Sequence, residues 1–117
     1  MVPKPVMIST GQIRLDNTNP NRMDKERFGA LMDNIKRYGF LIPVITNKDL
    51  VIADGEHRFR AGRALGLTSL PTIILDVSEV DRRMIRQVMN KLRGEHDLEK
   101  DLLDYKAIIE GGNGSSL

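Results

Sequence analysis

One short stretch of the chain constrains its fold more than any other, because it predicts a strand, a glycine turn and a helix start that already carries an arginine. The stretch is Ile52-Ala53-Asp54-Gly55-Glu56-His57-Arg58-Phe59-Arg60-Ala61-Gly62. The first N–H groups of a helix lack intrahelical partners and lie at the positive end of the helix dipole, so they suit a phosphate or another anion. Gly55 allows the backbone to approach such a ligand closely. The stretch therefore predicts an anion site.

The arginine inside this stretch is placed on the packed side of the predicted helix. If the helix spans residues 56–65, Arg58 shares the apolar face with Leu65. A guanidinium on a packed face needs a partner. Two interpretations stay open: Arg58 binds an anion, or it is neutralised by an internal carboxylate such as Asp54 or Glu56, or reaches solvent by snorkelling.

Composition excludes several classes of protein. With 117 residues and 40% hydrophobic content, the chain is long enough for one domain with its own core. It contains no cysteine, which excludes disulfides, thiolate zinc sites and cysteine nucleophiles. No apolar run approaches the length of a membrane span, and residues 1–10 lack the core of a signal peptide. We therefore expect a cytoplasmic protein without a membrane partner.

The overall charge says little about partners, but its distribution is informative. The chain has 18 basic and 16 acidic side chains, and a net charge of +2 is too small to indicate nucleic-acid binding. A basic segment between residues 82 and 93 contains Arg82, Arg83 and Arg86, which are candidates for contacts with DNA phosphates. The alternative is a solvated helix face, the usual role of such a segment.

Periodicity and turn residues predict alternating short strands and helices. We expect strands at 6–8, 40–46, 50–54 and 70–75, with 40–46 and 50–54 forming a hairpin, and helices at 24–39, 56–65, 78–94 and 97–109. Asp24 and Ser78 are the expected N-caps, and Gly39 is expected to end its helix in the left-handed conformation. The helix that begins after Ser78 has its apolar residues on one side, opposite most of its arginines: Val80, Met84, Ile85, Val88 and Leu92.

The domain is expected to cover residues 1–110. Residues 111–117 have the composition of a flexible tail, or of a linker to a domain that this sequence lacks.

Several segments, in order, resemble the ParB N-terminal domain of the ParB and sulfiredoxin-like superfamily, over about residues 5–110. The segments are Asn19-Pro20-Asn21-Arg22, the helix that ends at Gly39, the hairpin, Asp54-Gly55-Glu56-His57-Arg58-Phe59-Arg60-Ala61, and Asn90-Lys91-Leu92-Arg93. The resemblance implies an α+β fold, in which helices flank a small mixed β-sheet and further helices follow at the C-terminus.

The resemblance also implies a function. Partition proteins of this family bind CTP with Mg²⁺, and binding switches the domain into a clamp around DNA. For this chain it implies a nucleotide-dependent switch in a DNA-associated partition or regulatory protein of the nucleoid. The implied partners are DNA, a second copy of the chain on ligand binding, and a partition ATPase. CTPase or other NTPase activity stays undecided.

Site residues are carried over from the family motif by position. Gly55, Glu56, His57 and Arg58 are expected to surround the phosphates. Three further residues are expected to approach from other segments: Arg22, Asn90 and Arg93. Asn90 is also the expected magnesium ligand, and Glu56 is the expected catalytic residue if hydrolysis takes place.

Departures from the family pattern leave alternatives open. Met89 stands where partition proteins usually carry a glutamate that helps to hold the metal, which puts metal-assisted hydrolysis in doubt. Glu56 stands where the sulfiredoxin branch has its cysteine, so thiol chemistry is unavailable. A phosphotransferase such as a free serine kinase is the second hypothesis, with one of four acidic residues as a base: Asp24, Glu26, Asp54 or Glu56. A module that binds DNA without sequence preference, or a nuclease-like one, is the third, but no carboxylates are spaced for two metals.

Overall fold

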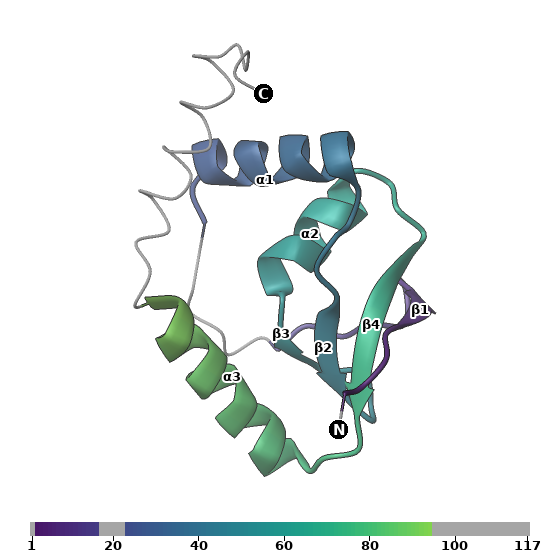
Figure 1. Ribbon diagram of the computed structural model, residues 1–117, viewed down its shortest axis with the longest axis vertical. Coiled ribbons are helices and arrows are strands. Elements are labelled where there is room, and N and C mark those ends of the chain that lie inside the picture. The colour runs from purple at the N-terminus through teal and green to yellow at the C-terminus, as the bar shows by residue number, and fades with distance from the viewer. Residues whose placement is uncertain (1, 17–22, 95–117) are drawn as a thin grey trace.

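The computed structural model describes residues 2–16 and 23–94 and shows a four-stranded mixed sheet with helices beside it (Figure 1). The elements, in chain order, are β1 (Val6–Ser9), α1 (Lys25–Tyr38), β2 (Val44–Asn47), β3 (Ile52–Asp54), α2 (Glu56–Ala64), β4 (Ser69–Leu75) and α3 (Glu79–Gly94). The strand order is β1-β4-β2-β3. The outer pairs are antiparallel, whereas β2 and β4 are parallel. The predicted α+β fold is confirmed.

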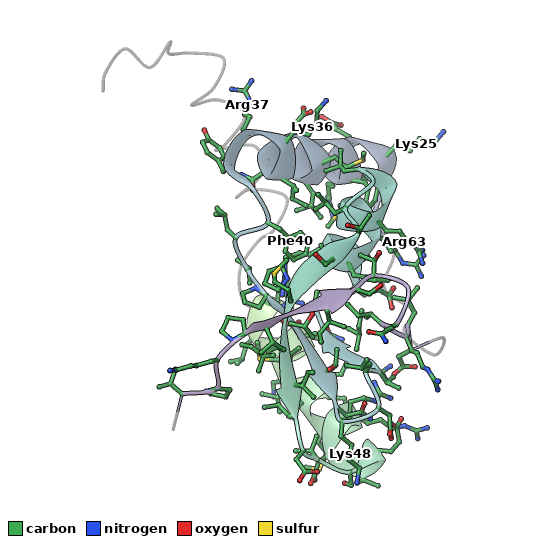
Figure 2. All side chains as sticks on the ribbon, turned by 90° about the vertical axis from the view of Figure 1, so that its right-hand side faces the viewer. Lys25, Lys36, Arg37, Phe40, Lys48 and Arg63 are labelled. Atoms are coloured by element: carbon green, nitrogen blue, oxygen red, sulfur yellow. The ribbon has the colours of Figure 1, made fainter. Side chains whose placement is uncertain are left out.

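The core lies between the sheet and α2. Phe59 of α2 is 1% exposed and packs with buried residues of the strands and of the segment after β1, namely Ile13, Val44, Ile52 and Leu70. The chain runs from β2 through β3 and α2 before it reaches β4, and a long connection of this kind is what parallel pairing of β2 with β4 requires. Helix α1 lies against α2, on the side away from the strands (Figure 1). Phe40, at the start of the loop into β2, reaches into this part of the molecule (Figure 2).

Most predicted helix ends and the hairpin are confirmed. The Asp24 side chain accepts a hydrogen bond of 2.8 Å from the Arg27 amide, and Ser78 accepts one of 3.1 Å from the Asp81 amide. Gly39 ends α1 with a positive φ of 90°, but its ψ of 177° is extended and not left-handed helical. β2 and β3 form the predicted antiparallel hairpin.

One strand begins later than the sequence indicates. We expected it to run from residue 40 to 46, but it covers Val44–Asn47. The carbonyl oxygens of Ile42 and Pro43, just before it, accept hydrogen bonds from the Arg58 side chain at 3.2 and 3.0 Å. A side chain therefore pairs with these carbonyls in place of a neighbouring strand.

Helix α3 is amphipathic as predicted, yet it docks with its polar side. Four of the five predicted apolar residues form an exposed apolar stripe, which we define as Val80, Met84, Val88 and Leu92 and which is 53 to 67% exposed. The fifth, Ile85, is partly buried. The helix instead lies along β3 through a buried arginine, Arg82, which is 2% exposed.

Three acceptors hold the Arg82 guanidinium. Nη1 donates to the Ile52 carbonyl at 2.8 Å and lies 2.9 Å from an Asp16 carboxylate oxygen, and Nη2 lies 2.5 Å from Glu79. Hydrogen bonds from this guanidinium lower the pKa of Glu79, and they raise that of Arg82 itself. Asn47 also donates to Glu79, at 3.4 Å, so the network links α3 to β2, to β3 and to the segment that precedes α1.

Some predicted elements lie outside the described residues. These are the helix at 97–109, the tail at 111–117 and the loop that carries Arg22. In the part of the chain that the structure describes, no helix combines the length and apolar character needed to cross a membrane.

The Arg82 network yields a stability prediction. Arg82→Ala leaves the Asp16 carboxylate and the Ile52 carbonyl without this partner, so it should lower the free energy of unfolding by about 3 kcal/mol. The neighbouring Arg83→Ala is the control, because its side chain is 60% exposed, and it should change stability by less than about 0.5 kcal/mol. Urea denaturation followed by circular dichroism measures both, and equal small losses would contradict the prediction.

Candidate anion site at the start of helix α2

Gly55 opens α2 in a conformation that few other residues adopt. Its φ is 101° and its ψ is 23°, in the left-handed region, and no side chain caps the helix. A Cβ atom at this position would lie 2.9 Å from Val44 Cγ1 and 2.9 Å from Arg58 Nη2. The residue is therefore required both by the backbone angle and by the lack of space. The first amides of α2 are left for a ligand, since a helix start has no partners of its own for them.

Arg58 has internal partners, so the interpretation that an internal carboxylate neutralises it is confirmed in part. Besides the carbonyls of Ile42 and Pro43, its Nη2 contacts a carboxylate oxygen of Asp54 at 3.4 Å. Burial lowers the pKa of Arg58, and the Asp54 carboxylate opposes that shift. Among the described residues, Arg58 donates its hydrogen bonds from Nε and Nη2, and none from Nη1. An incoming anion could therefore use Nη1 without breaking the existing bonds.

A second arginine arrives from far along the chain. Arg93, in the last turn of α3, donates from Nη2 to the other oxygen of Asp54 at 2.6 Å. The Asp54 carboxylate, with its residue 7% exposed, thus lies between two guanidinium groups. The family motif predicts both arginines at the site, but no local sequence pattern indicates that one carboxylate joins them.

The first turn of α2 carries two more ionisable side chains. Glu56 is buried, and its carboxylate lies 3.4 Å from Nε of Arg60, one turn later. His57 is half-buried, and burial lowers its pKa; the arginines at 60, 93 and 58 lower it further, whereas Glu56 raises it. A phosphate beside His57 would act in the same direction as Glu56, because a negative charge favours the imidazolium.

The family is decided by a comparison with known sequences. The sequence profile of the ParB N-terminal domain matches residues 4–91. The chain belongs to this family. The resemblance found in the motifs is thereby confirmed.

Relatives of this ParB N-terminal domain extend well beyond it. The chain is 32% identical over 102 residues to the chromosome-partitioning protein ParB of Myxococcus xanthus, an alignment that covers 84% of this chain and 34% of that protein. The chain thus spans about a third of the length of this relative.

Two solved structures share the fold. A C-terminally truncated ParB from Caulobacter crescentus, complexed with CTP-γ-S, superposes with a TM-score of 0.70 at 22% identity and covers 91% of this chain and 63% of that one. Sulfiredoxin from Arabidopsis thaliana gives 0.61 at 24% identity and covers 71% of this chain and 97% of that one. At these identities the likeness shows the ParB and sulfiredoxin-like fold.

The remaining predicted site residues of the ParB N-terminal domain fall into two groups. Asn90 lies on α3, one turn before Arg93, and is partly buried. Within residues 2–16 and 23–94, no group of three or more histidine and acidic side chains could hold a metal. The three arginines predicted to contact DNA lie elsewhere on α3. Arg82 is buried in its network, Arg83 contacts Glu79 at 3.4 Å, and Arg86 forms an ion pair with Asp16.

The two demands on Gly55 can be separated by mutation. The Cβ added by Gly55→Ala would be strained by the positive φ and would also collide with its neighbours. At Gly66, where φ is 84° and the space around the residue is open, Gly66→Ala adds the backbone strain alone. We expect Gly66→Ala to cost about 1 to 2 kcal/mol of stability and Gly55→Ala to cost more. Gly29→Ala, inside α1 with nothing near it, should stabilise by up to about 1 kcal/mol. Urea denaturation of the three variants measures this order, and a Gly55→Ala loss no larger than that of Gly66→Ala would contradict it.

Proposed function

We propose that this ParB N-terminal domain binds the phosphates of a nucleoside triphosphate, with CTP as the first choice, at the start of α2. The observation that carries the proposal is the uncapped, glycine-led start of α2 with Arg58 and Arg93 beside it. The CTP-γ-S in a structure of the same fold supports the choice of a cytidine nucleotide.

The chemistry of the site matches a polyanion. The amides of residues 56–58 supply donors along the positive end of the helix dipole. Arg58 can add Nη1, and Arg93 can turn its partly exposed guanidinium toward a phosphate; charge-assisted bonds of this kind are the strong ones. His57 is the third proposed phosphate ligand among the described residues, and Arg22, which lies outside them, remains a proposed ligand.

The geometry favours binding over turnover. Glu56, the proposed catalytic residue, already contacts Arg60, and Met89 offers no carboxylate to a metal. We propose that Mg²⁺ enters with the nucleotide, held mainly by phosphates and water, with the Asn90 amide oxygen as its protein ligand. CTP hydrolysis is a separate proposal that needs its own measurement of phosphate release.

The switch belongs to a longer DNA-associated protein in this proposal. The Myxococcus xanthus relative is a chromosome-partitioning protein, and a ParB of this fold has been solved on the centromeric parS site. We therefore propose a nucleoid location, DNA as a partner in the full-length context and a partition ATPase as a further partner. Of the three predicted DNA contacts, Arg83 is the one whose side chain is mostly exposed, so it is the best candidate.

The alternative function is a phosphotransferase that acts on a metabolite such as free serine. It would use the same phosphate site, with Asp54 or Glu56 as the base. Release of ADP or AMP that depends on serine would favour it over the switch.

The binding proposal is tested by calorimetric titration with CTP, ATP, GTP and UTP, with Mg²⁺ and with EDTA. Loss of a charged hydrogen bond costs about 1.5 to 3 kcal/mol, so Arg93→Ala should weaken triphosphate binding by about 10- to 100-fold. Arg37→Ala is the control, because Arg37 projects from the end of α1, away from the site (Figure 2). The proposal fails if no triphosphate binds, or if the two variants bind equally well.

Ligand binding is expected to bring two copies together through the apolar stripe of α3. Exposed apolar surface of this extent on one helix is typical of an interface. Val88→Asp should therefore abolish a CTP-induced dimer and leave CTP affinity unchanged. Val2→Asp, at a valine outside the stripe that is 86% exposed against 54% for Val88, should leave the dimer intact. Sedimentation velocity with and without CTP measures both; a dimer that survives Val88→Asp would show that another surface is used.

A further inference from the structure

The Asp54 carboxylate contacts two arginines that depend on it to different degrees. Arg58 is also held by the carbonyls of Ile42 and Pro43, and its contact with Asp54, at 3.4 Å, is the longest of the three. Within the described part of the chain, the side chain of Arg93 hydrogen-bonds to Asp54 alone, at 2.6 Å. Loss of the Asp54 charge would therefore release Arg93 much more than Arg58.

The last turn of α3 depends on the same ion pair. The other polar contacts between α3 and the rest of the described chain come from its first half, from Glu79, Arg82 and Arg86. Near its end the recorded polar contact is that of Arg93 with Asp54. The apolar stripe faces solvent, so it does not hold this turn; Ile85 and Met89, which are partly buried, precede it on the helix.

We infer that Asp54 is a built-in competitor of the phosphate at Arg93, so that binding of a polyanion and docking of the last turn of α3 oppose each other. This inference rests on the proposed function. A guanidinium that donates to Asp54 cannot direct the same N–H groups at a phosphate, and the buried carboxylate also repels the incoming negative charge. Asp54 is thus a positioning residue that couples the site to α3.

Linkage fixes the sign of the effect. If a ligand weakens the pair between Asp54 and Arg93, then weakening the pair must strengthen ligand binding by the same factor. A carboxylate that helped to bind the phosphate, through a metal or by holding Arg93 ready, would have the opposite effect. Removal of the Asp54 charge therefore distinguishes a competitor from a helper.

The first experiment needs no ligand. Hydrogen exchange of the 117-residue chain is compared for wild type, Asp54→Asn and the control Asp33→Asn, which changes an exposed carboxylate on α1. Asp54→Asn should speed amide exchange in the last turn of α3 by about two- to fivefold, the factor that an ion pair of this exposure contributes. Unchanged exchange there would overturn the claim that Asp54 holds this turn.

The second experiment titrates CTP into the same three proteins, with Mg²⁺ and with EDTA. Asp54→Asn should bind about two- to fivefold more tightly than wild type in both conditions, a factor again set by the strength of the ion pair. Asp33→Asn should match wild type. If Asp54→Asn binds CTP as tightly as wild type or more weakly, the competition is overturned. If its CTP affinity is lower in Mg²⁺ but not in EDTA, Asp54 is a metal ligand instead.

A second variant keeps the result independent of how well Asp54→Asn folds. Arg93→Gln breaks the same pair from its more exposed side, so it should speed exchange at the end of α3 as Asp54→Asn does, yet weaken CTP binding. Parallel effects on exchange with opposite effects on affinity support the inference, and parallel effects on both would overturn it. If wild type binds no triphosphate, the proposed function fails together with the competition, while the exchange data still report whether Asp54 holds the helix.

Discussion

The buried guanidinium of Arg82 fixes the position of α3, and the anion site depends on that position. A fully buried arginine is costly unless its charge and its donors are matched, and here two carboxylates and one carbonyl match them. The network holds the first half of α3 against β3. Because the helix is rigid, its other end then lies beside Asp54. Arg93 meets the start of α2 only because Arg82, eleven positions earlier on the helix, is held in place.

Polar docking explains why α3 leaves its apolar residues in solvent. A helix on the surface of a domain normally buries its apolar stripe, since that burial is the main source of its stability. In the described structure α3 is held by ion pairs, and its stripe stays available for another surface. Ion pairs can exchange one negative partner for another with little change in shape, whereas a packed apolar face cannot. The helix is therefore suited to respond to an anion.

Local sequence patterns predicted the elements well, because each has its signal within a few residues. Asp24, Ser78 and Gly55 are recognisable from their neighbours alone, and so is the hairpin. The role of Arg82 was not recognisable, because a buried and a solvated arginine have the same helical spacing. The late start of β2 had a similar cause: Arg58, which takes the carbonyls of Ile42 and Pro43, lies 15 residues or more further along the chain. The pairing of Asp54 with Arg93 spans 39 residues and is set by the fold as a whole.

A carboxylate on β3 and one on α3 would affect the phosphate site differently. The resemblance to partition proteins would place a glutamate at Met89, on the helix that carries Asn90 and Arg93, where it would move with them. Asp54 instead belongs to the last position of a buried strand, so its charge stays fixed while α3 moves. Before a ligand arrives, that fixed charge offsets part of the field of Arg58 and Arg93. After a phosphate takes Arg93, Asp54 still has Arg58 beside it, so the carboxylate is not left buried without a counter-charge. The arrangement allows α3 to be released without the large penalty that an unpaired buried charge would impose.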